Sequence, residues 1–123
     1  MKPVAVVVGI LLAAAVVSVA PAVVAVAPAV VAVAPAVVVT AQRILDAPPT
    51  LIQVVPLTST LRGFHTEVVI EPDPANGLGQ SSAAQCQHVR AVSPARVAGT
   101  IGNVGPLALL QIRETIAVII DLP

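Results

Sequence analysis

The sequence contains no tryptophan or tyrosine, and only one phenylalanine and one cysteine among its 123 residues. With so few aromatic rings, the chain has almost no surface on which nucleic-acid bases could stack. The single cysteine, Cys86, excludes an internal disulfide and fits a reducing compartment. Six basic and six acidic side chains cancel. No overall field therefore attracts nucleic acid, and any such binding depends on a few local arginines.

Charge is absent from the front of the chain, because residues 4–39 contain no Asp, Glu, Lys or Arg. The apolar run of residues 4–20 follows Lys2 and is similar to a signal peptide. It also lies at the lower length limit for a membrane helix. Its richness in valine favours a strand instead. A membrane association is therefore predicted only through residues 2–20.

A seven-residue repeat, APAVVAV, follows at residues 20–40, with Pro21, Pro28 and Pro35 equally spaced. These prolines exclude one continuous helix, because each would remove a helical hydrogen bond. Each unit is compatible with a proline followed by a short strand, since continuous Val/Ala runs are typical of strands buried on both faces. The alternative is a simple sequence expansion without a structural role. The sequence alone leaves both interpretations open.

The remainder has the pattern of a small β-rich domain. Leu107 and Leu110 lie beside the apolar helical stripe after Pro106, so the last helix is apolar on more than one face. Such a helix suits packing against both its own domain and a partner. Together the elements predict a mainly β fold, a small barrel or strongly bent sheet with a C-terminal α-helix. We expect strands at residues 51–57, 66–70, 85–92 and 99–102, a loop at 71–77 and a helix at 106–122.

Four segments in order resemble the MazF/PemK family of toxin endoribonucleases. They read PAVVVTAQRI, VVPLTSTLRGFHTEVVI, GLGQSSAAQCQHVRAV and TIGNVGP…IIDLP, and lie within residues 35–123. The resemblance implies an SH3-like (PemK/MazF-type) barrel and a homodimer that acts as the toxin of a type II toxin–antitoxin system. It also implies cleavage of single-stranded RNA in the bacterial cytoplasm, without a metal or other cofactor, and a cognate antitoxin as partner.

The family's opening strand has no counterpart in residues 1–33. The third repeat unit, residues 34–40, stands where the family has a strand reading Arg-Pro-(small)-Val-Val-Val, and the earlier units look like copies of it. We therefore expect two regions, a hydrophobic Val/Ala/Pro segment at residues 1–34 and a barrel domain at residues 35–123. In this arrangement the hydrophobic repeat replaces the first strand.

The resemblance also implies site residues. Family catalysis depends largely on an Arg just before the strand proline and on the first Thr of a Pro-(apolar)-Thr-(Ser/Thr) motif. The Thr is present as Thr58, but Ala34 stands in place of the Arg. Losing one preorganised donor commonly lowers a rate by about a hundred- to a thousandfold. The expected RNA-binding residues are Ser59, Arg62 and Arg90, and no metal ligand is expected.

Alternatives accompany these roles. Arg62 is compatible with a solvated loop charge as well as a phosphate ligand. His65 and His88 are expected at the surface, and Cys86 is expected to be a small buried apolar side chain. For the whole chain, the leading hypothesis is an endoribonuclease impaired by the loss of its first strand and catalytic Arg. A catalytically inactive, antitoxin-binding homologue and a membrane-tethered or exported β domain are the alternatives.

Overall fold

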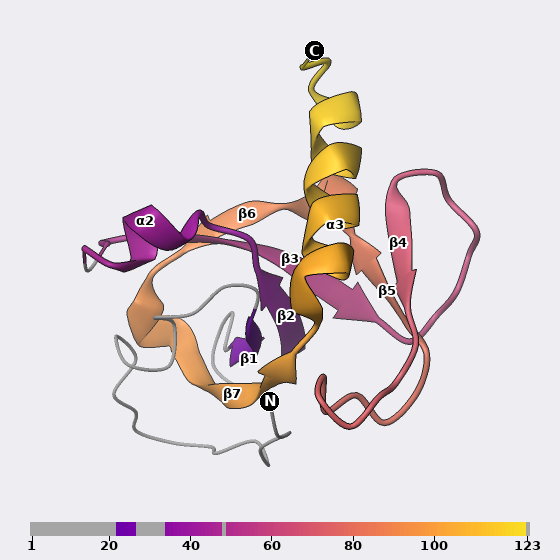
Figure 1. The fold of residues 1–123 in the computed structure, drawn as a ribbon, viewed down its shortest axis with the longest axis horizontal. Coiled ribbons are helices and arrows are strands. Elements are labelled where there is room, and N and C mark those ends of the chain that lie inside the picture. Colours follow the sequence, from indigo (N-terminus) through magenta and orange to yellow (C-terminus); the bar gives the residue numbers. More distant parts are fainter. Residues whose placement is uncertain (1–21, 27–33, 48, 123) are drawn as a thin grey trace.

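The computed structural model describes residues 22–26, 34–47 and 49–122 (Figure 1). The segment considered as a signal or membrane anchor, residues 2–20, lies outside these ranges, as does most of the middle repeat unit. Within the described ranges no helix has both the length and the apolar character needed to span a membrane. The elements in chain order are β1 (Ala22–Val26), β2 (Ala34–Val38), α2 (Gln42–Leu45), β3 (Ile52–Thr58), β4 (Glu67–Ile70), β5 (Ser82–Gln85), the 3-10 turn η1 (Cys86–His88), β6 (Arg90–Val92), the 3-10 turn η2 (Pro94–Arg96), β7 (Val97–Asn103) and α3 (Gly105–Ile119).

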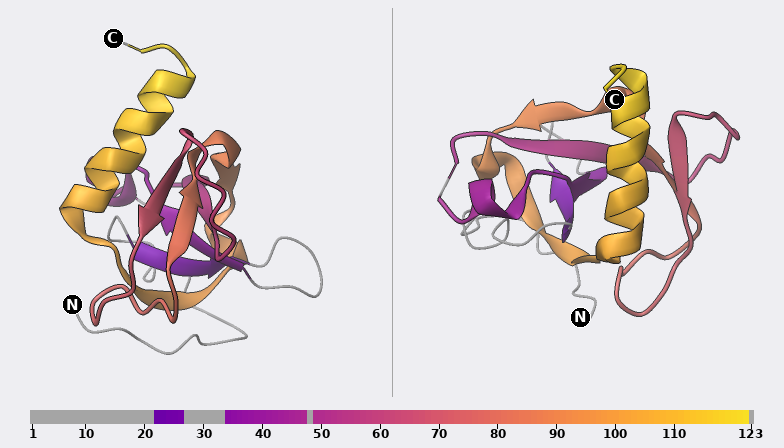
Figure 2. Two further views of the ribbon diagram at one scale, coloured as in Figure 1. Left: turned by 90° about the vertical axis from the view of Figure 1, so that its right-hand side faces the viewer. Right: turned by 45° about the horizontal axis from the view of Figure 1, so that its top comes forward.

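The seven strands form one antiparallel sheet in the order β4-β5-β3-β2-β1-β7, and β6 pairs with β3 beside β5. The sheet bends strongly around its own concave side, as the two views of Figure 2 show. Among the described residues β4 pairs only with β5 and β7 only with β1, so the sheet does not close into a barrel. The predicted fold class, mainly β with a C-terminal helix, is confirmed, and the expected barrel takes the form of an open, bent sheet.

The repeat supplies an interior strand. β1 lies between β2 and β7, with Val26 opposite Ala34 on one side and Ala22 opposite Asn103 on the other. A strand from the hydrophobic repeat is therefore the first strand of the described sheet. The sheet also includes a strand that lies before the boundary expected at residue 34. This strand, β1, pairs with β2 on one edge and with β7 on the other.

The valine-rich strands are buried on both faces, as continuous apolar runs favour. Val24 and Val54 belong to a core on the concave side of the sheet, whereas their neighbours Val23 and Val55 belong to a second core under α3. All four are at most 1% exposed. Alternation along a strand therefore places one valine of each neighbouring pair in each core, which explains why apolar residues occupy both faces of these strands.

One strand expected at residues 85–92 is two strands, and that prediction is wrong. Continuing the Leu57–Ala84 register would place residue 89 opposite Ile52, yet Val92 occupies that position. The three inserted residues are those of η1. The Cys86 N–H donates to Thr66 O at 3.1 Å, so the chain follows β4 to this point before it returns to β3. A local pattern could not reveal this change of partner.

Helix α3 packs along one side of the sheet, against β4 and η1 (Figures 1 and 2). Ile112 is fully buried, and Leu109 and Ile116 pack beside it in the second core. Leu107 and Leu110 face away and are 68% and 52% exposed. The helix is therefore apolar on an outward face too, as its sequence predicts.

Candidate active site

A groove of about 460 Å³ opens where β3 ends. We call it the Thr58 groove. Its floor comes from β2 and β3 and their ends, and its opposite wall from the segment that leads into β5. None of the described side chains that line it carries a charge. The lining residues are Pro35, Leu57, Thr58, Ser59, Leu78, Gly79, Gln80 and Ser82.

Strands β2 and β3 both reach this groove. Ala36 lies opposite Pro56 in the β2–β3 pair. The β2–β3 pairing ends at this pair, and Leu57 and Thr58 pair with β5 instead. Pro35 nevertheless lines the same groove as Thr58. The strand that the family resemblance assigns to a catalytic Arg therefore reaches the groove through Pro35, the residue that follows position 34.

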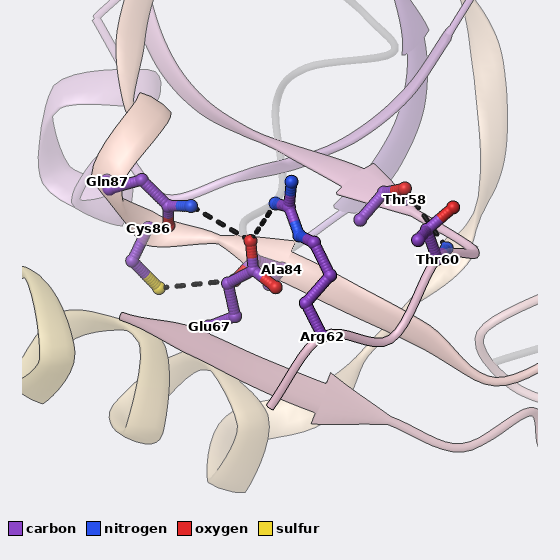
Figure 3. Close-up of polar contacts among 7 residues, drawn as sticks. All are labelled: Thr58, Thr60, Arg62, Glu67, Ala84, Cys86 and Gln87. Carbon is purple, nitrogen blue, oxygen red and sulfur yellow. Dashed lines mark hydrogen bonds and ion pairs between the residues drawn. The ribbon is translucent and has the colours of Figure 1, made fainter. Parts of the chain in front are cut away.

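The hydroxyl of Thr58 has a defined orientation. Its Oγ1 accepts a hydrogen bond from the Thr60 N–H at 3.1 Å (Figure 3), a local turn typical of Ser and Thr. Thr58 is partly exposed on the groove floor. Among the described residues its hydroxyl hydrogen has no recorded acceptor, so Thr58 can donate a hydrogen bond to a ligand in the groove.

The wall of the groove is fixed by a buried asparagine in the preceding loop. Asn76 is 1% exposed, and its side-chain oxygen accepts from the backbone N–H groups of Asp73 and Leu78, at 3.1 and 3.0 Å. Its amide donates to Glu71 O at 2.8 Å. These three bonds hold the loop in a compact shape just before Gly79 and Gln80, which line the groove.

Glycine allows this loop to approach β7. A Cβ at Gly102 would lie 2.5 Å from the backbone carbonyl atoms of Asn76, and the Asn103 N–H donates to Ala75 O at 2.9 Å. Gly77 has φ of +69°, and a Cβ at this position would lie 2.5 Å from the backbone oxygen of Ile101. The predicted loop at residues 71–77 is thus an ordered element that joins β7 to the groove wall.

Arg62 lies outside the groove lining. Its guanidinium forms an ion pair with Glu67 and lies 4.6 Å from the centre of the Phe64 ring. The Glu67 oxygen that binds Arg62 also accepts from Gln87 Nε2 at 2.8 Å. In Figure 3 the guanidinium points toward Glu67 and Gln87, with Thr58 on its other side.

Burial acts to raise the pKa of Glu67, but the hydrogen bonds from Gln87 and Arg62 and the charge of Arg62 outweigh it. The net result is a pKa of Glu67 below its ordinary value of 4.5. The carboxylate is therefore charged at neutral pH although its side chain is only 2% exposed.

Arg90 is also distant from Thr58. It begins β6 and lies opposite Val54 of β3, four residues before Thr58. Four residues of strand correspond to about 13 Å. The structure therefore brings Thr58 and Ser59 together in one groove and does not bring Arg62 or Arg90 into its lining.

The other titratable candidates agree with their expected places. His65 and His88 are exposed, and Cys86 is fully buried. Burial raises the pKa of the Cys86 thiol to about 11, which makes it an unreactive core side chain. In the described part of the chain, no three His, Cys, Asp or Glu side chains gather closely enough to hold a metal ion.

A family model described as "PemK-like, MazF-like toxin of type II toxin-antitoxin system" matches residues 16–120. The chain belongs to this family. The match begins earlier than the residue 35 at which the sequence resemblance starts, and it therefore includes β1. Among curated proteins, none matches the chain by sequence.

Solved MazF structures share this fold at low sequence identity. Mycobacterium tuberculosis toxin MazF-mt6 has 24% identity and a TM-score of 0.70, over 83% of this chain and 98% of that one. A MazE–MazF structure from Deinococcus radiodurans has 20% identity and a TM-score of 0.70, over 85% and 95% of the two chains. An endoribonuclease in complex with its cognate antitoxin, from a mycobacterial species, has 18% identity and a TM-score of 0.71, over 85% and 96%.

Several residues of this MazF/PemK-family groove carry no signal in the sequence. Gln80 and Ser82 line it from the far side of a loop, and Glu67 binds the arginine expected to contact RNA. The spacing of 20 or more residues between Thr58 and this wall gives no pattern to detect. The run Glu71–Gly77, rich in Pro, Asp and Asn, was the one local indication that an ordered turn lies nearby.

Proposed function

We propose that this family member is a toxin that binds single-stranded RNA in the Thr58 groove and cleaves it slowly, without a metal ion. The observation that supports the proposal is the groove itself, whose lining includes both the motif threonine Thr58 and Pro35 of β2. The groove is open and lined by hydroxyl, amide and apolar groups. An extended, flexible strand with a single phosphate at its centre suits this lining better than a compact metabolite.

The reaction is a transesterification within the RNA. The 2′-oxygen attacks the adjacent phosphorus and loses its proton to water, while the bond from phosphorus to the 5′-oxygen of the next nucleotide breaks and that oxygen takes up a proton from water. The products are a 2′,3′-cyclic phosphate and a 5′-hydroxyl. Thr58 donates its hydroxyl hydrogen to a non-bridging phosphate oxygen and stabilises the charge that develops there. Ser59 adds a second hydroxyl at the same end of the groove.

The low rate follows from the missing cation. No lining residue of the described groove is charged, so only neutral hydroxyl donors face the developing phosphate charge. Arg90 contributes to RNA binding from outside the groove as a longer-range positive charge, and Arg62 does so only when it is released from Glu67. The loss of a fixed arginine lowers the rate by about a hundred- to a thousandfold.

The partners proposed are an antitoxin and a second copy of the chain, in the bacterial cytoplasm. Two of the similar structures are named as complexes with MazE or with a cognate antitoxin. The outward face of α3, with Leu107 and Leu110 exposed, is the kind of surface that a second subunit would cover.

Cleavage of a labelled single-stranded RNA tests the proposal. Wild-type protein is expected to give slow cleavage that is unchanged by EDTA and yields cyclic-phosphate ends. Thr58→Ala removes the donor and should abolish this activity, whereas the matched control Thr58→Ser keeps the hydroxyl and should retain most of it. Equal cleavage by wild type and Thr58→Ala would remove Thr58 from the mechanism. No cleavage by wild type, with tight binding of the antitoxin, would assign an antitoxin-binding role instead.

A further inference from the structure

A partly buried polar cluster neutralises Arg62. The cluster consists of Arg62, Glu67 and Gln87, and we call it the Glu67 cluster (Figure 3). One carboxylate oxygen of Glu67 accepts from both partners. The other, Oε1, is buried without a hydrogen-bond partner, as is the side-chain oxygen of Gln87. Gln85, opposite Glu67 in the β4–β5 pair, also helps to lower the pKa of this carboxyl. Among the described residues Arg62 is the one cation that pairs with Glu67, and a carboxylate with little access to water depends strongly on such a partner.

The backbone around Arg62 does not hold the side chain in place by itself. Residues 59–65 form no strand or helix and are exposed. Gly63, at φ of +70°, has open space around it. The recorded contacts of the Arg62 guanidinium are Glu67 and the ring of Phe64. The side chain is 37% exposed, compared with 2% for Glu67, so water and ligands can reach the arginine but not the carboxylate.

The chain between Thr58 and Arg62 is short enough for the Arg62 guanidinium to take a second position, at the Thr58 groove. Arg62 follows Thr58 by four residues, and the intervening segment leads directly out of the groove. In Figure 3 the guanidinium lies between the Glu67 carboxylate and Thr58. An RNA phosphate on the Thr58 hydroxyl would be a second bidentate partner for the same guanidinium, because arginine binds carboxylate and phosphate in similar geometry.

We propose that Glu67 holds Arg62 away from the RNA as an autoinhibitory contact, so that RNA phosphate and Glu67 compete for one guanidinium. The inference rests on the proposed function and adds its regulation. In the wild-type protein the competition favours Glu67, because release of Arg62 would leave the buried carboxylate without a cation. Replacing Glu67 by a neutral isostere removes that cost and makes Arg62 available to the phosphate.

Binding of a fluorescent oligonucleotide of random sequence tests this inference. Its 2′-oxygens are methylated, so it cannot be cleaved. Glu67→Gln should bind about five- to tenfold more tightly than wild type at low salt. Its plot of log affinity against log salt should be steeper by about 0.7, the value for one added phosphate contact on a single strand. Glu114→Gln, which removes one exposed carboxylate from α3, controls for net charge and should change affinity less than twofold.

A double variant assigns the gain to Arg62. Glu67→Gln combined with Arg62→Gln has the net charge of wild type and should return both affinity and salt slope to the wild-type values. Thermal unfolding shows whether each variant is folded. If Glu67→Gln does not fold, Glu67→Asp carries the test, since it keeps the net charge but shortens the reach to Arg62. Glu67→Asp should then bind more tightly than wild type.

Two results would overturn this inference but not the proposed function. In the first, wild type binds the oligonucleotide, but Glu67→Gln gains no more affinity than Glu114→Gln does. In the second, the double variant keeps the higher affinity of Glu67→Gln. Failure of every protein to bind the oligonucleotide, wild type included, would overturn the proposed RNA function and this inference with it.

Discussion

At the scale of single residues, the proposed site depends on one hydroxyl and one replaced side chain. Thr58 retains the hydroxyl of the family motif, and Ala34 stands where the family resemblance expects an arginine. Pro35, the residue after Ala34, lines the same groove as Thr58. An arginine at position 34 would therefore extend from a strand that borders the groove.

Ala34→Arg should raise RNA cleavage at least about tenfold, because the introduced guanidinium extends from a strand that borders the groove and can stabilise the same phosphate charge. Initial rates on the labelled RNA would measure the effect. Ala34→Gln is the matched control, since it adds a long polar side chain without charge and should give a much smaller gain. A folded Ala34→Arg protein with the wild-type rate would show that a cation at this position alone does not restore the site.

Glu67 predicts a pH dependence of stability. Its folded pKa is lowered, so the charged carboxylate stabilises the folded state above the ordinary value of 4.5 and that stabilisation is lost as pH falls through the folded pKa. Glu67→Gln lacks this contribution at every pH. The difference in urea midpoint between wild type and Glu67→Gln should therefore be largest near pH 7 and shrink toward pH 3. A difference that stays constant over this range would contradict the assignment.

Sequence reasoning reaches some of these residues and not others. Thr58 and Ser59 are found because a contiguous motif carries them, and Cys86 because a lone cysteine without cationic neighbours is usually buried. The ion pair of Arg62 could not be predicted, since its partner Glu67 begins the next strand and Gln87 lies in a 3-10 turn. The expected role of Arg62 in RNA binding therefore depends on the proposed competition between Glu67 and RNA phosphate, and the sequence alone does not indicate that Glu67 is the partner of Arg62.

At the scale of elements, the loop before β5 determines the groove wall. It is held by the side chain of Asn76 and by its close approach to Gly102. The composition of residues 71–77 predicts a turn. It cannot predict that the turn packs on β7, because β7 follows about 25 residues later and pairs with β1 on its other edge. The helix at α3 is predicted well, since Ile112 and its neighbours repeat at helical spacing.

Gly102→Ala should destabilise the protein by about 1–3 kcal/mol, because the added methyl group overlaps the Asn76 backbone and the loop must move. Urea unfolding measures the change. Gly79→Ala is the matched control: its Cβ would meet nothing within 4 Å, and its stability should change by less than about 0.5 kcal/mol. Equal effects of the two substitutions would show that the loop does not pack on β7 as described.

At the scale of the whole molecule, the repeat completes the sheet. β1 pairs with β2 and β7 and places Val23 and Val24, both fully buried, in the two cores. Sequence reasoning left the repeat units open between short strands and a simple expansion without a structural role. It could not place β1, because all units share nearly one sequence and any of them could pair beside β2. The family match from residue 16 agrees with a domain that includes this strand.

Two deletions test that role. Deleting residues 2–19 removes none of the described residues and should leave the thermal transition and the sedimentation behaviour of the folded protein intact. Deleting residues 2–33 removes β1, which exposes the edges of β2 and β7 and loses two buried valines worth about 1.5–3 kcal/mol each. That protein should be unfolded or aggregated. Circular dichroism melting and sedimentation velocity on the full chain and both deletions would decide. A cooperative, soluble product of the 2–33 deletion would show instead that the domain folds from residue 34 onward and that β1 is an accessory strand.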